Sequence, residues 1–211
     1  MSSSKNLSLF YKLMTFLVFM SAYGVLYVIP NFFSDQPAGE LPLLWIDKVV
    51  PLVPWTFLIY TSDYLVFLIT ILWLTEKEDF LSFTRMMFGV LGVCGLFFYS
   101  YPTIYPRPDY ASFAPGGVIG AAMEFIAVAD SPRNCFPSMH VGLTAVATWS
   151  LRKKGPKILG LFGLWSLAIF ASTLTTKQHY FLDIIGGLAV MILIAFVEHR
   201  LISPRFRRFS Q

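Results

Sequence analysis

Two short stretches of the chain carry residue types suited to phosphate binding and proton transfer: NCFPSMHVG at 134–142 and TTKQHYFLDIIGG at 175–187. They hold two of the three histidines, His140 and His179, each at the start of a long apolar run. His179 and Asp183 are four residues apart, a spacing that places them on one face of a helix. A carboxylate there accepts one ring N–H of the histidine and leaves the other nitrogen as a base or nucleophile.

The first stretch has the features of a helix start. Pro137 is typical of the first helical residue, because its missing N–H is not needed there. Ser138 and His140 are then expected in the first turn, where unpaired backbone N–H groups and the helix dipole favour phosphate. The stretch therefore predicts a phosphate clamp with a proton donor beside it.

The composition indicates a membrane protein. Hydrophobic residues make up 56% of the 211 residues and charged residues 13%, about half of the roughly 25% typical of soluble proteins. We expect one integral-membrane domain over residues 1–211. The two cysteines, Cys94 and Cys135, predict no disulfide, and no zinc site is expected because neither histidine has a cysteine or an HExxH-type partner nearby.

The apolar runs predict an all-α bundle of six transmembrane helices, each near the roughly 20 residues that a bilayer requires. The fourth is short, and we expect it to extend on its N-terminal side. A loop with an interfacial LPLLWI piece is expected over Pro30–Lys48, and a short amphipathic helix near Val118–Val128. The six predicted spans are Phe10–Ile29, Pro54–Leu74, Thr84–Ser100, Met139–Leu151, Ile158–Leu174 and Tyr180–Glu198.

The distribution of lysine and arginine predicts the orientation. With both termini in the cytoplasm, twelve of the sixteen positive residues face the cytoplasm, as the positive-inside rule requires. The net charge of +4 then reflects topology, and no nucleic-acid partner is expected. The fourth and sixth spans both start at the outer face, so both histidines are expected at one extracytoplasmic surface. The positive residues of the outer segments are Lys48, Arg107, Arg133 and Lys177.

Taken together, these residues resemble the type 2 phosphatidic acid phosphatase superfamily of membrane phosphatases and phosphotransferases. Its pattern is Lys-x6-Arg-Pro, then Pro-Ser-x-His, then Ser-Arg-x5-His-x3-Asp. The resemblance covers roughly Tyr99 to Gly187, a motif-bearing core of about 99–187. The matching residues are Arg107 and Pro108, then Pro137, Ser138, Met139 and His140, then Ser172, His179 and Asp183.

Two cations of the family pattern are absent. Ser100 stands at the lysine position and Thr173 at the arginine position. Lys177 and Arg133 are close in sequence and are the candidates to replace them. The local sequences KQHYFLDIIGG and FPSMH resemble most the branch of the superfamily that includes inositol phosphorylceramide synthases. These enzymes transfer a phospho-head-group between lipids.

The resemblance implies a mechanism. His179 would be the nucleophile and form a phosphohistidine, Asp183 would orient it, and His140 would protonate the leaving oxygen and then activate the acceptor. Arg107 and Ser138 would bind the phosphate, with Lys177 and Arg133 as further candidates. No metal and no cofactor are implied.

Three functions stay open at this point: a lipid-phosphate phosphatase, a phospho-head-group transferase, and a proton-coupled transporter that uses His179, Asp183 and Asp63 as relay groups. Asp63 is unexpected because it falls within an apolar run, where a charge is costly and usually functional or paired. The partners expected are a lipid phosphate and the bilayer. The location is a cell (inner) membrane with an extracytoplasmic site, and the same charge rule allows an endomembrane with a lumenal site. The sequence indicates no oligomeric state.

Overall fold

The structure is a computed structural model of the chain, and it describes residues 7–113 and 115–202. Almost all of its regular structure is helical, and the only sheet among the described residues has two short parallel strands. In chain order the elements are α1 (Leu9–Tyr23), η1 (Gly24–Val28), α2 (Ile29–Phe32), β1 (Gly39–Glu40), α3 (Trp45–Val49), α4 (Thr56–Thr61), α5 (Asp63–Trp73), α6 (Lys77–Ser100), β2 (Thr103–Ile104), η2 (Tyr110–Ser112), α7 (Gly117–Ala129), α8 (Met139–Ser150), η3 (Leu151–Lys154), α9 (Pro156–Thr175), α10 (Phe181–Val197) and η4 (Glu198–Ile202).

Five helices in the described part of the chain are long and apolar enough to cross a membrane. This confirms the predicted all-α, multi-pass membrane bundle. The boundaries differ in places from the predicted spans, most of all at the start of α6, which begins at Lys77 and not at Thr84. The five helices are Leu9–Phe32, Thr56–Trp73, Lys77–Ser100, Pro156–Thr175 and Phe181–Ile202.

The first helix also continues past the expected loop start at Pro30. The π-helical turn η1 precedes α2, so Pro30 occupies the first turn of a new α-helical segment, where no N–H is needed. The helix therefore runs on to Phe32.

Helix α8, the predicted fourth span, has only 12 residues, fewer than the roughly 20 that a bilayer requires. The expected N-terminal extension is wrong, because residues 130–138 form an irregular segment. Pro137 is also outside the helix. Ser138 is extended and caps α8 instead, with its Oγ accepting the N–H of Val141 at 3.3 Å.

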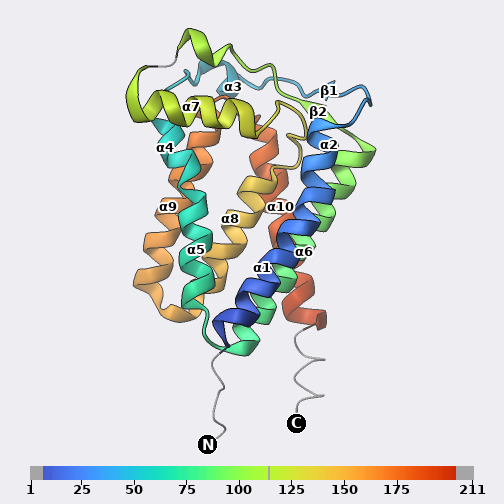
Figure 1. Cartoon of the computed structure of the whole chain (residues 1–211), viewed down its shortest axis with the longest axis vertical. Coiled ribbons are helices and arrows are strands. Elements are labelled where there is room, and N and C mark those ends of the chain that lie inside the picture. Colours follow the sequence, from blue (N-terminus) through green and yellow to red (C-terminus); the bar gives the residue numbers. More distant parts are fainter. Residues whose placement is uncertain (1–6, 114, 203–211) are drawn as a thin grey trace, which may run out of the picture.

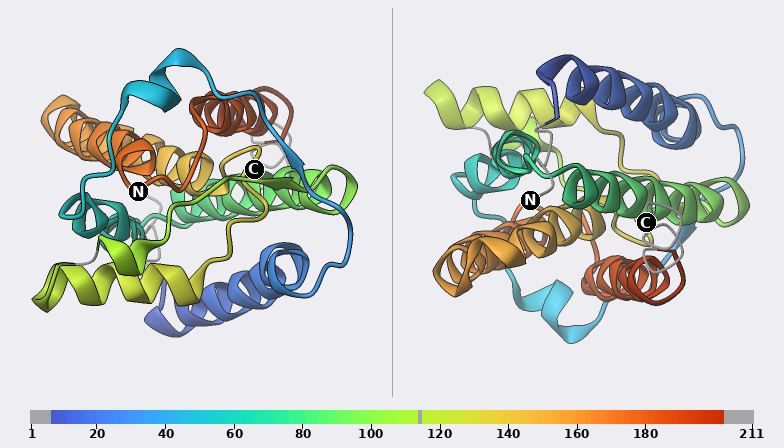
Figure 2. Two further views of the ribbon diagram at one scale, coloured as in Figure 1. Left: turned by 90° about the horizontal axis from the view of Figure 1, so that it is seen from above. Right: turned by 90° about the horizontal axis from the view of Figure 1, so that it is seen from below.

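Helix α8 lies at the centre of the bundle and packs against α5, α6, α9 and α10 (Figure 2). Its approach to α10 depends on two glycines. A Cβ on Gly187 would lie 2.4 Å from the carbonyl oxygen of Ser138, and one on Gly142 would lie 3.2 Å from the carbonyl oxygen of Gly187. Small residues allow membrane helices to approach this closely, and here they bring the start of α8 against α10.

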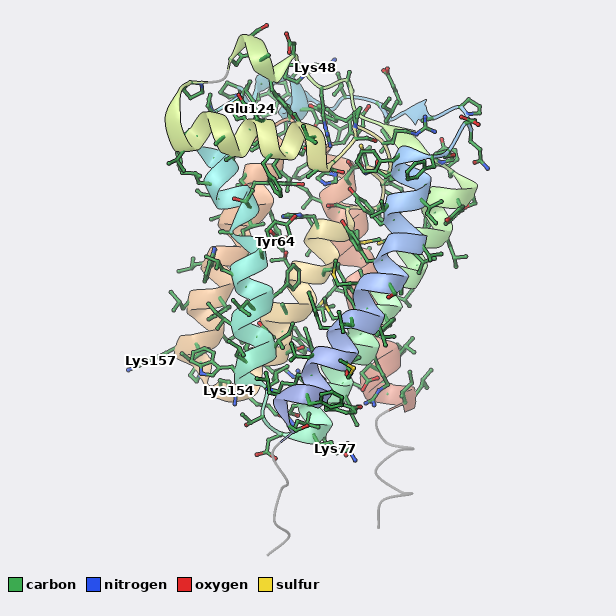
Figure 3. The ribbon with its side chains drawn as sticks, in the orientation of Figure 1. Lys48, Tyr64, Lys77, Glu124, Lys154 and Lys157 are labelled. Carbon is green, nitrogen blue, oxygen red and sulfur yellow. The ribbon has the colours of Figure 1, made fainter. Side chains whose placement is uncertain are left out.

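Helix α7 lies across one end of the bundle, which we call the α7 end (Figure 1). It confirms the short helix expected near Val118–Val128, and the LPLLWI piece leads into α3 at the same end. Lys48 and Glu124 lie at the α7 end, whereas Lys77, Lys154 and Lys157 lie at the opposite end (Figure 3). Both α8 and α10 begin near the α7 end (Figure 1).

Candidate functional site

His179 and Asp183 form a buried pair at the start of α10. Nδ1 of His179 lies 3.2 Å from Oδ2 of Asp183, and the same oxygen accepts the N–H of Tyr180 at 2.9 Å. His179 precedes the helix, so the pair belongs to the helix cap and does not share a helical face as predicted. A carboxylate accepts a hydrogen bond from the protonated Nδ1, so this tautomer leaves a lone pair on Nε2.

Ser138 connects this pair to the second histidine stretch. Its Oγ lies 3.3 Å from Nε2 of His179, and its N–H donates to the carbonyl oxygen of Asp183 at 3.0 Å. The backbone of His179 is held in turn by its N–H, which donates to the carbonyl oxygen of Thr173 at 3.3 Å. The two sequence stretches therefore meet, and the free nitrogen of His179 faces the residue that caps α8.

His140 has an acidic partner that the sequence did not identify. Its Nδ1 lies 3.4 Å from Oδ2 of Asp63, the first residue of α5, which is 4% exposed. The imidazole stacks on the ring of Tyr60 with centroids 4.3 Å apart and planes inclined by 11°. Nε2 of His140 has no hydrogen-bond partner among the described residues. The site thus contains two His–Asp pairs.

Both histidines line one cavity of about 530 Å³, a size usual for small-molecule sites. Asn134 lines it too, although sequence reasoning gave this residue no role. Its side chain is buried, and within the described chain neither its Oδ1 nor its Nδ2 has a hydrogen-bond partner. Its φ of 57° lies in the left-handed region, which asparagine tolerates better than most residues. An unpaired buried amide costs free energy, so Asn134 is a candidate ligand for a substrate.

Arg107, the expected phosphate-binding arginine, is paired with Asp130. Nη1 donates to the Asp130 carbonyl oxygen at 2.7 Å and Nη2 to Oδ2 at 3.1 Å. Burial alone would lower the pKa of Arg107, but Asp130 together with the nearby Tyr110, Tyr60 and Cys135 raises the pKa above its usual range. Asp130 lines the cavity of the histidines and also accepts hydrogen bonds from Tyr27 and Asn31 of the first helix. The guanidinium of Arg107 is therefore paired with Asp130 through both of its terminal nitrogens.

Lys177 and Arg133 are directed to backbone carbonyls. Nζ of Lys177 donates to Asp47 and Val50, and burial lowers its pKa although Asp47 opposes the shift. Nη2 of Arg133 donates to the carbonyl oxygen of Gln36. These contacts tie together the loops at the α7 end, and neither residue is among the described residues that line the cavity with the histidines.

Ser100 and Thr173, which stand where the family pattern has cations, form hydrogen bonds within their own helices. Oγ of Ser100 donates to the carbonyl oxygen of Leu96 at 2.6 Å, and Oγ1 of Thr173 donates to that of Phe170 at 2.7 Å. Each hydroxyl is thus bound within its own helix. Any charge on a bound phosphate must be balanced by other groups.

Cys135 lies close to His179 and Asp183, contrary to the expectation that neither histidine has a nearby cysteine. One ligand atom from each residue lies within 4.8 Å of the others. Such an S, N and O set can bind zinc. However, burial raises the pKa of the Cys135 thiol well above its usual range, and Sγ lies 3.2 Å from the carbonyl oxygen of Pro132. The thiolate that a metal needs is therefore disfavoured.

The family of the chain follows from comparison with known families. A model of the PAP2 superfamily matches residues 39–197, a range that contains both His–Asp pairs. The chain belongs to the PAP2 superfamily. No curated protein matches it in a sequence search.

Membership of the PAP2 superfamily confirms the resemblance that the motifs carry, and it fits a phosphatase or phosphotransferase. Together with the five apolar helices, it identifies the chain as a multi-pass membrane enzyme of this kind. The closer relationship to inositol phosphorylceramide synthases stays a prediction.

Proposed function

We propose that the protein is a lipid-phosphate phosphatase or phosphotransferase that works through a phosphohistidine on Nε2 of His179. The observation that carries the proposal is the arrangement of His179: Nδ1 faces Asp183, and Nε2 lies beside Ser138 in a cavity that also holds His140. A histidine oriented by a carboxylate, with its other nitrogen at a cavity, is the arrangement of an activated nucleophile.

The reaction has two steps. Nε2 of His179 attacks phosphorus, the bond to the leaving oxygen breaks, and the proton on Nε2 of His140 passes to that oxygen. Water or an alcohol then attacks the phosphohistidine while His140 takes its proton, and the P–N bond breaks. Asp63 is a positioning residue in this scheme, because its contact with Nδ1 of His140 orients the ring and leaves Nε2 as the atom that transfers the proton.

The phosphate is proposed to bind between Asn134, Ser138 and the N–H groups at the start of α8. The amide of Asn134 supplies unpaired donors, and the helix dipole favours an anion. Arg107 would act on the phosphate indirectly, because it is paired with Asp130, which lines the cavity. Lys177 and Arg133 would act indirectly, by holding the loops around the site.

The site is proposed to face the extracytoplasmic side of a cell membrane. Three of the lysines that predict a cytoplasmic end, Lys77, Lys154 and Lys157, lie at the end opposite α7 (Figure 3). The positive-inside rule then assigns the α7 end to the outside. Accessibility labelling of a cysteine placed at Glu124 in intact cells tests this assignment, and labelling only after the cells are opened contradicts it.

The proposed reaction is tested by supplying the purified protein with a panel of lipid phosphates, with and without a lipid alcohol. Release of inorganic phosphate identifies a phosphatase. Label that appears in a new lipid only when donor and acceptor are both present identifies a transferase. Neither product from any donor would contradict the proposal.

The variant Asn134→Asp is expected to reduce kcat/KM by about 100-fold, mainly through a higher KM. Aspartate retains the shape and tolerates the positive φ, but it replaces a donor with a negative charge that repels phosphate. Kinetics with a short-chain phosphate and competition by inorganic phosphate measure the effect. An unchanged KM and an unchanged inhibition constant would exclude Asn134 from the phosphate site.

The variant Asp63→Asn is expected to lower kcat by about 10- to 100-fold with little change in KM, because asparagine no longer stabilises the imidazolium of His140. The loss in kcat/KM, which reports the first step, should be smaller with a nitrophenyl leaving group, which needs no acid, and Asp63→Glu should recover part of the rate. The neighbouring Ser62→Ala is the control, since Ser62 bonds Trp165 outside this pair. Equal losses in kcat/KM for both leaving groups would indicate a structural role only.

A further inference from the structure

The cavity of the two histidines extends far beyond the reacting groups. On the first helix its lining residues include Tyr27 and, much further along, Lys12. These residues are fifteen positions apart, which corresponds to about 22 Å along a helix. Half of the hydrocarbon core of a bilayer is about 15 Å. The cavity therefore continues past the depth that one leaflet occupies.

The walls change from polar to apolar along this length. At the α7 end they carry Asp63, Asn134 and the two histidines, and further along they carry side chains such as Phe16 and Leu68. Helices α1 and α5 approach each other at the end opposite α7 and separate toward the α7 end (Figure 1). Tyr64, labelled in Figure 3, lies on the side of α5 that faces this space.

Lys12 lines the far part of the cavity, together with Leu9. Its Nζ donates to the carbonyl oxygens of Ile71 and Leu72 at 2.7 and 3.2 Å, near the end of α5, and lies 5.7 Å from the centre of the Phe80 ring. A cation is stabilised at the C-terminal end of a helix. Because the ammonium group is used in this way and Lys12 is 6% exposed, it forms part of the wall and does not serve as a second anion site.

The wall formed by α5 is open. Tyr64 and Leu68 line the cavity and yet are 59% and 52% exposed. Most of α1 is also uncovered, with 6% of its most apolar window buried within the described chain. The cavity can therefore exchange a hydrocarbon chain with the surrounding bilayer between these two helices.

We propose that this cavity binds the hydrocarbon chain of the substrate across the bilayer midplane, so that the enzyme prefers lipid phosphates whose chain is longer than one leaflet, such as polyprenyl phosphates. The inference rests on the proposed function, since the phosphate must sit at His179. It adds the class of lipid and the part of the protein that measures its length.

The preference has its origin in packing. A chain that leaves the bilayer for the cavity gains little from the hydrophobic effect, because lipid is equally apolar. The chain gains van der Waals contacts with the side chains of the cavity wall. A chain that reaches only halfway along the cavity lacks the contacts of the remaining half. We expect about a tenfold advantage in kcat/KM for the long chain, within the range that apolar pockets achieve.

The test compares phosphate release from farnesyl phosphate and from a long polyprenyl phosphate in bilayer nanodiscs. Both have the same reacting group and differ in chain length. The wild type is expected to prefer the long chain about tenfold. The variant Leu68→Trp, which fills the middle of the cavity, is expected to lose this preference and to retain its rate with farnesyl phosphate.

Leu65→Trp is the matched control. Leu65 is another half-exposed leucine of α5, at 51%, and is not among the described residues that line the cavity. It should keep the preference. If Leu68→Trp also loses its farnesyl activity, Phe16→Trp on the opposite wall replaces it as the test variant.

The outcomes separate the two proposals. Equal rates with both prenyl phosphates, or a preference that survives the cavity-filling variant, overturn the chain inference and leave the phosphatase proposal standing. No release from either compound, and no transfer when an acceptor is supplied, overturns both.

Discussion

Replacement of His179 by alanine is expected to abolish turnover, with a loss in kcat of at least about 1,000-fold. Its Nε2 is the atom proposed to bond to phosphorus, and the described structure offers no second nitrogen that is both held by a carboxylate and placed beside Ser138. Removal of a nucleophile from a set of groups that act as a unit eliminates most of the rate enhancement. Release of phosphate by purified protein measures the loss.

The matched control for this variant is His199→Ala. His199 lies in η4, where it contacts Trp149 and Arg152 away from the cavity, and its replacement is expected to leave the rate within a few-fold of the wild type. Thermal unfolding of both variants in detergent shows whether they remain folded. A folded His179→Ala protein with near-normal turnover would rule out the phosphohistidine mechanism.

Replacement of His140 by alanine is expected to slow turnover by about 100- to 10,000-fold, the range of general acid–base catalysis. Both steps use its Nε2, which is buried and has no hydrogen-bond partner within the described residues, and His140 is among the residues that line the cavity. With a nitrophenyl leaving group the first step needs no proton, so phosphate transfer to His179 continues while dephosphorylation is slow. The variant should therefore accumulate a phosphoenzyme.

This accumulation is measured with a labelled donor. The label should remain on the protein in base and be released in acid, as for a phosphoramidate, and it should be absent from the double variant His140→Ala/His179→Ala. A burst of nitrophenol equal to the amount of enzyme should accompany it. A His140→Ala protein that turns over slowly without a burst and without label would show that His140 does not act in the second step.

Several features could be predicted from the sequence because they depend on local chemistry. Apolar runs of membrane length predict helices wherever water is excluded, since every backbone group must be paired within its own segment. The four-residue spacing of His179 and Asp183 predicts their contact, because such a spacing brings side chains together even at a helix start. The three-part motif, with His140 in its second part, correctly predicted the PAP2 superfamily.

Local errors arose where two patterns competed. Pro137 and Ser138 are both typical of helix starts, and the structure uses the serine as the cap. A run from Met139 to Leu151 suggested a span that extends further, yet α8 is short. It is enclosed by other helices, so its length need not match the bilayer.

Only the tertiary structure decided which groups are partners across the bundle. Asp63 and His140 are 77 positions apart, and their contact depends on the packing of α5 against α8. In the same way, Asp130 pairs with Arg107 across 23 positions of the chain, and Asn134 is left as a buried amide without a partner in the described structure.

Residue types and their spacing were therefore enough to predict most of the helices, the family and the two histidine stretches, whereas the packing of the helices fixes the second His–Asp pair and the cavity that joins it to the first. The two kinds of feature depend on interactions over different separations along the chain. Helix formation and spacing depend on neighbours within one or two turns. Partners and cavities depend on how closely whole helices approach, and at α8 and α10 this is set by Gly142 and Gly187.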